Sequence, residues 1–233
     1  MPGSDGARDI AQELFRGLAP SYDKTVDYAT LYQDRYWKRW AAERAALSDG
    51  SLVLDLGCGT LLFEERLRSN SKFVGLDVTP EMARIGWAKG LANVSLVVNG
   101  DAETLPFHDE IFDAAVSCYV PKYVSMPRLA GELARVVKPG ARVVLYDFAK
   151  PGGFSAPLLE PYIQVGLRAM GLVLRKTRSG AAFTFEELPR IVDGTSWDKE
   201  VVGAMEDGGF ETMAAMPLTA GVVFAYCGRK RSK

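Results

Sequence analysis

The chain has 233 residues, of which 28 are basic, 29 are acidic and 48% are hydrophobic, so its formal net charge is -1. This apolar fraction and small net charge exclude a mostly disordered chain. The near-neutral total also argues against a surface that attracts nucleic acid throughout. We therefore expect one ordinary globular domain without a nucleic-acid partner.

Cysteine spacing and the chain ends indicate the cellular compartment. Cys58, Cys118 and Cys227 are too widely spaced for a zinc site, and their odd number argues against a disulfide framework. The N-terminus lacks the apolar core of a signal peptide, and no uninterrupted apolar run could cross a bilayer. We expect a cytoplasmic protein. Four basic residues among the last five are interpreted as a solvated tail, with contact to anionic lipid as the alternative.

The first 48 residues have the periodicity of helices. Apolar residues recur at helical spacing, first as Ile10, Leu14, Phe15 and Leu18 and then as the aromatic stripe Tyr28, Tyr32, Tyr36 and Trp40. Aromatic side chains bury much apolar surface, so we expect the stripe to pack against the main body rather than contact a ligand. The region 1–48 is predicted to form a helical lid.

Short apolar runs then alternate with helical segments. The predicted strands are 52–56, 72–77, 94–99, 112–119 and 142–148, with helices over 61–67, 80–89 and 128–137. Such alternation predicts crossover units and a mostly parallel sheet with helices on both faces. The core 49–150 is therefore expected to have a Rossmann-like α/β fold.

The last third of the chain departs from this alternation. An amphipathic helical segment within 151–190 is interpreted as an inserted cap, with a membrane-surface helix as the alternative. The segment 191–233 supplies a closing helix near 199–207 and two strands, 210–216 and 221–227, joined by a short loop. These strands predict an antiparallel hairpin at one edge of a seven-stranded sheet. We expect 1–233 to be a single domain.

A glycine-rich turn follows the first predicted strand. In Asp55-Leu56-Gly57-Cys58-Gly59-Thr60, the glycines let backbone amides approach a ligand closely. A dinucleotide fingerprint would require a third glycine where Leu62 stands, and Asp55 would repel a pyrophosphate. The turn therefore argues against a nicotinamide dinucleotide.

An acidic residue ends the second predicted strand, and another follows the third. Asp77 can accept hydrogen bonds from both hydroxyls of a ribose, and Asp101 can accept one from an adenine amino group. Open sheets bind ligands at the carboxyl ends of their strands. Together with the glycine turn, these residues predict a nucleoside that carries no pyrophosphate.

These motifs, and others along the chain, resemble those of class I S-adenosylmethionine-dependent methyltransferases. Nearly the whole chain is more closely similar to the ubiquinone/menaquinone-biosynthesis C-methyltransferase family. The matching segments are Leu14-Phe15, Leu18-Ala19, Tyr22-Asp23, 55–60, 101–103, 105–107, 112–114, 136–140, 148–151 and 218–223. This family has an Arg in a Leu-Arg-Asn sequence where Pro121-Lys122-Tyr123 stands here.

The resemblance implies S-adenosylmethionine as the cofactor. The expected cofactor-binding residues are Tyr22, Asp55, Gly57, Cys58, Gly59, Thr60, Asp77, Val78, Asp101, Ala102 and Cys118. Among them, Gly57, Gly59 and Thr60 would surround the methionyl part, and Tyr22 would close the site from the lid. No metal is expected, because the sulfonium already carries an activated methyl group.

Three residues at or just beyond the ends of the fourth and fifth predicted strands are candidates for catalysis: Tyr119, Lys122 and Asp147. Asp147 ends a strand, where a base and a structural hydrogen-bond acceptor are equally plausible. Lys122 could orient a substrate oxygen or lie on the surface. His108 is interpreted as a solvated turn residue.

We expect a small apolar aromatic or isoprenoid methyl acceptor. Methylation of a ring carbon and methylation of an oxygen both remain open, as does a noncatalytic cofactor-binding module. Peripheral membrane contact and the oligomeric state are also left open.

Overall fold

Seven strands form one sheet in the order β3-β2-β1-β4-β5-β7-β6 in the computed structural model, which describes residues 4–67, 69–150 and 190–232. They are β1 (Leu52–Leu56), β2 (Lys72–Asp77), β3 (Val94–Asn99), β4 (Phe112–Cys118), β5 (Val137–Phe148), β6 (Phe210–Leu218) and β7 (Val223–Lys230). The first five are parallel, whereas β7 is antiparallel to both β5 and β6. The predicted α/β sheet is confirmed.

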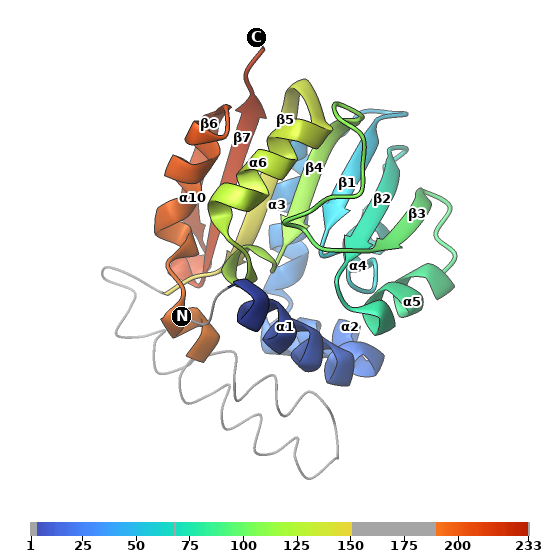
Figure 1. Cartoon of the computed structure of the whole chain (residues 1–233). Coiled ribbons are helices and arrows are strands. Elements are labelled where there is room, and N and C mark those ends of the chain that lie inside the picture. The colour runs from blue at the N-terminus through green and yellow to red at the C-terminus, as the bar shows by residue number, and fades with distance from the viewer. Residues whose placement is uncertain (1–3, 68, 151–189, 233) are drawn as a thin grey trace.

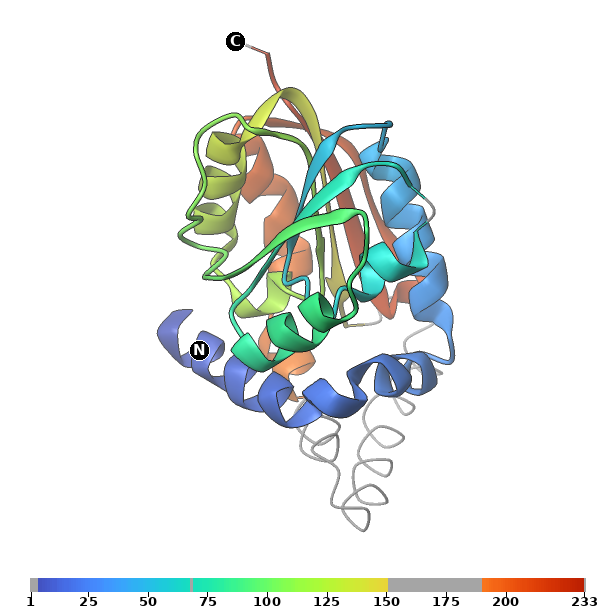
Figure 2. The ribbon, with the colours of Figure 1, turned by 90° about the vertical axis from the view of Figure 1, so that its right-hand side faces the viewer.

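Helices cover both faces of the sheet (Figure 2). Helices α6 (Met126–Val136) and α10 (Trp197–Asp207) lie on one face, and α3 (Gln33–Ala45) and α4 (Leu62–Arg66) lie on the other. The sequence of α6 explains its placement: Met126, Leu129, Leu133 and Val136 recur at helical spacing and are buried against the sheet. Each face thus has its own apolar core.

Two N-terminal helices lie across the carboxyl ends of the parallel strands (Figure 1). These are α1 (Ser4–Leu18) and α2 (Tyr22–Ala29), with α5 (Pro80–Ala88) packed against α1 and against β2 and β3. The Gln12 side-chain amide in α1 donates a hydrogen bond of 2.8 Å to the Val78 carbonyl, just after β2. The N-terminal region therefore covers the edge of the sheet where a ligand is expected.

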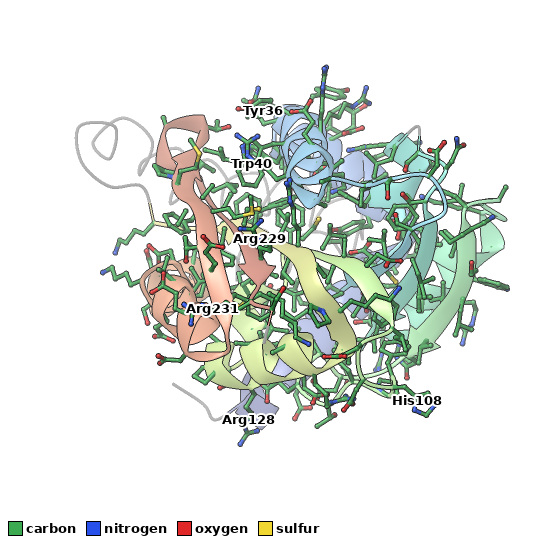
Figure 3. The ribbon with its side chains drawn as sticks, turned by 90° about the horizontal axis from the view of Figure 1, so that it is seen from above. Tyr36, Trp40, His108, Arg128, Arg229 and Arg231 are labelled. Carbon is green, nitrogen blue, oxygen red and sulfur yellow. The ribbon has the colours of Figure 1, made fainter. Side chains whose placement is uncertain are left out.

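The prediction that the aromatic stripe belongs to the core is wrong for three of its four members. Tyr28, Tyr32 and Tyr36 are 61%, 48% and 52% exposed, and only Trp40, at 7%, is buried. Figure 3 shows Tyr36 projecting from the rim of the molecule. The helix is interrupted because Leu31 and Tyr32 have left-handed backbone angles, with φ of 49° and 62°. The stripe is thus divided, with Tyr28 in α2, Tyr32 in the turn that follows, and Tyr36 and Trp40 in α3.

The C-terminal hairpin is present, with its turn at Thr219–Gly221. The basic tail begins inside β7, which ends at Lys230. Arg229 pairs with Glu211 at 2.8 Å, and Lys230 pairs with Glu110 at 3.0 Å. The expected cap and its membrane-helix alternative fall on 151–189, outside the described residues. Within the described part of the chain, no helix has the length and apolar character needed to span a membrane.

Candidate functional site

The glycine turn after β1 forms one wall of the candidate site. Gly57 has a φ of +70°, and a Cβ atom on it would lie 2.1 Å from Cγ2 of Val120. Gly59 also has a positive φ, of +55°, and its amide donates a hydrogen bond of 2.8 Å to Asp77. Side chains at these two positions would fill the space beside the turn.

A cavity of about 780 Å³ lies beside this turn. It brings together eight residues that the sequence predicts to bind the cofactor: Tyr22, Gly57, Gly59, Asp77, Val78, Asp101, Ala102 and Cys118. Sequence reasoning missed Ala11, Met82 and Glu103, which also line the cavity. Ala11 precedes Phe15 by one helical turn in α1, so the same helix face supplies both residues to the cavity.

Asp77 is the central carboxylate of this cavity. Its Oδ2 accepts from the Gly59 amide and its Oδ1 accepts from the Thr79 amide, both at 2.8 Å. Burial raises the pKa of Asp77 to about 6, against the opposing effect of these hydrogen bonds. Each carboxylate oxygen retains a further lone pair, so ribose hydroxyls can still donate to the side chain.

Three predicted cofactor ligands, Asp55, Cys58 and Thr60, lie behind the cavity wall. They are 1%, 5% and 1% exposed and do not line the cavity. The Thr60 hydroxyl donates a hydrogen bond of 2.5 Å to Asp23 in the first turn of α2, so it connects the glycine turn to the N-terminal helices. Direct contact of these three residues with the cofactor stays a prediction.

The cavity fits the cofactor that the resemblance implies. Gly57 and Gly59 leave room for a ligand to approach the backbone of the turn, and the Asp77 carboxylate has acceptor sites left for ribose hydroxyls. Phe15, Tyr22 and Tyr119 add aromatic rings to its lining, and aromatic faces attract cations such as a sulfonium. In the described part of the chain, no cluster of three or more histidine, cysteine or acidic side chains could hold a metal ion.

A second cavity of about 500 Å³ adjoins the first. Its lining is mostly apolar and comes mainly from α1 and α2: Leu14, Phe15, Leu18, Tyr22, Thr25, Val26, Ala29, Thr30, Tyr119, Lys122, Tyr123 and Phe148. Phe15, Tyr22, Tyr119 and Tyr123 line both cavities. These four rings therefore stand where the two cavities meet, with Phe15 edge-on to Tyr22 and Tyr123.

Tyr119 is held at this junction in a strained conformation. Its φ of +69° is unfavourable for a residue with a side chain. Its hydroxyl donates a hydrogen bond of 2.6 Å to Asp34, and its ring stacks on Phe148 at 5.1 Å. Burial and the nearby Asp34 carboxylate raise the pKa of Tyr119 well above its usual value, so the hydroxyl stays protonated.

Lys122 and Asp147 form a fully buried ion pair beside the second cavity. Nζ of Lys122 is 2.6 Å from Oδ1 of Asp147 and donates another hydrogen bond, of 2.9 Å, to the Tyr119 carbonyl. Asp147 also accepts from the amides of Lys122 and Phe148. Burial lowers the pKa of Lys122 and raises that of Asp147, while each partner opposes this effect on the other. Lys122 lines the second cavity, whereas Asp147 lines neither.

A buried charged network behind Tyr119 was missing from the sequence predictions. Asp34 is fully buried, and its carboxylate lies 2.7 Å from Nζ of Lys38 and 2.5 Å from a guanidinium nitrogen of Arg66. The four-residue spacing of Asp34 and Lys38 on one helix is a recognisable signal for an ion pair. The burial of this ion pair cannot be recognised from the sequence, because Arg66 and Tyr119 contact Asp34 from distant parts of the chain.

His108 takes no part in either cavity. It is exposed in the turn before β4, and Figure 3 shows it at the periphery of the molecule. The interpretation of this residue as a solvated turn residue is confirmed.

Comparisons with solved structures agree on the fold. A SAM dependent methyltransferase from Aquifex aeolicus is 19% identical, with a TM-score of 0.58 over 82% of this chain and 88% of the other. The cyclase SpnF is 18% identical, with a TM-score of 0.60, and the match covers 85% of this chain and 82% of the cyclase chain. Since a cyclase and a methyltransferase share the architecture, the fold alone does not define the activity.

Sequence comparison identifies the family. Residues 4–230 match the model of the ubiE/COQ5 methyltransferase family. The demethylmenaquinone methyltransferase of Mycobacterium bovis (strain BCG / Pasteur 1173P2) is 31% identical over 230 residues, which cover 97% of this chain and 94% of that protein. The chain therefore belongs to the ubiE/COQ5 methyltransferase family and is an S-adenosylmethionine-dependent methyltransferase.

Proposed function

We propose that the protein methylates a ring carbon of a quinol whose remaining substituents are apolar, as a demethylmenaquinol-type acceptor would be. The observation that carries this proposal is the second cavity, which is lined mainly by apolar side chains and adjoins the cofactor cavity. An apolar ring and its hydrocarbon substituent would leave water on entering it. The name of the relative from Mycobacterium bovis supports the same substrate class.

In this proposal the first cavity holds the cofactor and the second holds the methyl acceptor. The cofactor supplies a methyl group activated by a sulfonium. Asp77 and Asp101 hold the nucleoside end in the first cavity, and the acceptor ring occupies the second. Phe15, Tyr22 and Tyr123 stand at the junction, where they align the acceptor carbon with the methyl group and exclude water.

We place the hydroxyl group of Tyr22 against an oxygen atom of the acceptor. Tyr22 lines both cavities and makes no side-chain hydrogen bond to a described residue. Burial and the nearby Asp34 carboxylate raise the pKa of Tyr22 well above its usual value, so this hydroxyl remains a donor. When the quinol hydroxyl loses its proton to water, the hydrogen bond from Tyr22 would stabilise the resulting oxyanion and so favour the ionised form, whose ring carbon is the nucleophile.

The three candidate catalytic residues take different roles in this account. Tyr119 contributes its ring to both cavities, while Asp34 holds its hydroxyl. Lys122 lines the acceptor cavity and holds the Tyr119 carbonyl. Asp147 already accepts three hydrogen bonds and lines neither cavity, so we assign it to positioning Lys122 rather than to proton abstraction.

Filling the second cavity should block the acceptor and spare the cofactor. Val26 lines only this cavity, so Val26→Phe places additional side-chain volume there. We expect kcat/KM for a short-chain demethylmenaquinol to fall by about tenfold or more, which is a loss of about 1.4 kcal/mol or more. The Kd for S-adenosylmethionine should stay within about twofold of the wild-type value. Steady-state kinetics and calorimetry measure the two quantities.

Tyr28→Trp is the matched control, because Tyr28 lies on the same helix but is 61% exposed. It should leave both quantities unchanged. An unaltered kcat/KM in a folded Val26→Phe variant would place the acceptor elsewhere and contradict the proposal.

A further inference from the structure

Tyr119 is held in place through every polar group that it has. Its backbone amide donates to the Tyr146 carbonyl at 2.9 Å, and its own carbonyl accepts from Nζ of Lys122 at 2.9 Å. Its hydroxyl donates to Oδ1 of Asp34 at 2.6 Å, and its ring stacks on that of Phe148. The ring is therefore fixed both from the backbone and from its hydroxyl end.

The backbone of Tyr119 is strained where it holds this ring. Its φ of +69° is easy for glycine, whereas a side chain at such a position costs conformational energy. Among the described residues other than glycine that have a positive φ, Tyr119 alone lines either of the two cavities. Such strain persists only where the surrounding structure enforces it, and it is concentrated at functional sites. Its presence where the two cavities meet points to a function for the ring.

Asp34 is the fixed partner of the Tyr119 hydroxyl. It is fully buried in α3, where its Oδ1 is 2.7 Å from Nζ of Lys38 and its Oδ2 is 2.5 Å from a guanidinium nitrogen of Arg66. Its backbone amide donates to the hydroxyl of Thr30 at 3.3 Å. A carboxylate held by two cations cannot shift without weakening these ion pairs. Asp34 therefore offers the hydroxyl a rigid acceptor.

Arg66 connects this acceptor to the helices around the site. Another nitrogen of the same guanidinium is 2.7 Å from Asp27 in α2, so one side chain of α4 binds both α2 and α3. Helix α4 follows the glycine turn of the cofactor cavity, and α2 supplies Val26 and Ala29 to the second cavity. Asp34 is thus tied to elements that form the walls of both cavities.

We propose that Asp34 is a positioning residue for methyl transfer, which acts through the Tyr119 hydroxyl to hold the Tyr119 ring beside the path from the cofactor to the acceptor. This inference rests on the proposed placement of the cofactor in the first cavity and of the acceptor in the second. A ring fixed at their junction limits the orientations in which the acceptor can lie against the methyl group. Asp34 itself lines neither cavity, so its effect should appear in the rate of methyl transfer rather than in ligand affinity.

Tyr119→Phe removes the contact with Asp34 and keeps the ring. The rate constant for methyl transfer would be measured in a single turnover, with S-adenosylmethionine and a reduced short-chain demethylnaphthoquinone both saturating, so that product release does not limit it. We expect this rate constant to fall by about tenfold or more, because a ring freed at one end admits misaligned acceptors. The Kd for S-adenosylmethionine and the KM for the acceptor should stay within about threefold of the wild-type values.

Tyr146→Phe is the matched control. The Tyr146 hydroxyl is buried beside the same charged groups, 3.4 Å from Nζ of Lys38, and Tyr146 lines neither cavity. The substitution therefore removes the same atom without releasing the Tyr119 ring. The single-turnover rate constant should stay within about twofold of the wild-type value. An equal fall in both variants would indicate a general loosening of the buried groups and would overturn the inference, as would an unchanged rate constant in Tyr119→Phe.

Asp34→Asn tests whether Asp34 acts through that hydroxyl. The amide is a weaker acceptor than the carboxylate, so methyl transfer should slow by about threefold or more. In the Tyr119→Phe background the same substitution should cause no further slowing, since the contact is already absent. Asp27→Asn is the control, because Asp27 shares Arg66 with Asp34 and lines neither cavity. It should lower the Tm and leave the rate constant within about twofold of the wild-type value.

The possible results distinguish this inference from the function on which it rests. If Asp34→Asn is too unstable to purify, Tyr119→Phe and its control still decide the question. Further slowing by Asp34→Asn in the Tyr119→Phe background would show that Asp34 acts by another route and would overturn the inference. A folded wild type that binds the cofactor but does not methylate the acceptor ring would instead contradict the proposed function, and the inference with it.

Discussion

Replacing Lys122 with Met should be among the most destabilising substitutions in the protein. The ammonium of Lys122 is the cation beside Asp147, and both side chains are at most 1% exposed. Removal of one member of a buried pair leaves an uncompensated charge and typically costs about 3–5 kcal/mol. We expect Lys122→Met to lose this amount of unfolding free energy, measured by urea denaturation.

A second replacement should recover part of that loss. In Lys122→Met with Asp147→Leu, no charge remains unpaired, so the double variant should be more stable than Lys122→Met alone. The matched control is Lys138→Met, which breaks a pair with Asp113 whose side chains are 46% and 37% exposed. That exposed pair should contribute less than about 1 kcal/mol. Equal losses for Lys122→Met and Lys138→Met would contradict this view of the Lys122–Asp147 pair.

The largest effect on cofactor binding should come from Asp77→Asn. The substitution removes the charge that accepts from the Gly59 and Thr79 amides and that we expect to accept from the ribose hydroxyls. Hydrogen bonds to a charged group contribute about 1.5–3 kcal/mol each. Loss of two ribose contacts should therefore raise the Kd for S-adenosylmethionine by about 100-fold or more, measured by calorimetry.

Asp109→Asn is the control, because it makes the same change at a carboxylate that is 71% exposed beside Arg135 and lines neither cavity. Its Kd should match that of the wild type. A Kd increase below threefold in a folded Asp77→Asn variant would show that Asp77 does not hold the ribose.

The sheet was predictable because its signals are local. The runs that became β1, β2 and β3 have the bounds expected from their apolar sequences and from the residues that end them. The aromatic stripe failed because four-residue spacing does not reveal whether a helix continues. Leu31 and Tyr32 adopt left-handed angles that are unusual for such side chains, and no glycine marks the break.

The cofactor cavity was also largely predictable, because its residues follow successive strand ends. The missing parts depend on contacts between distant segments. Thr60 turns toward Asp23, 37 residues away, and Tyr119 reaches Asp34, 85 residues away. Lys122 is buried because Asp147 and the Tyr119 carbonyl receive its ammonium, which no spacing within 121–123 could indicate.

The proposed function is tested most directly by identifying the product of the reaction. Purified protein would be incubated with S-adenosylmethionine carrying a deuterated methyl group and with a chemically reduced short-chain demethylnaphthoquinone, and the product would be analysed by mass spectrometry and NMR. We expect a deuterated methyl group on the ring carbon, formed much more slowly by Val26→Phe than by Tyr28→Trp. A label on oxygen, or no labelled product from a protein that binds the cofactor, would contradict the proposed function.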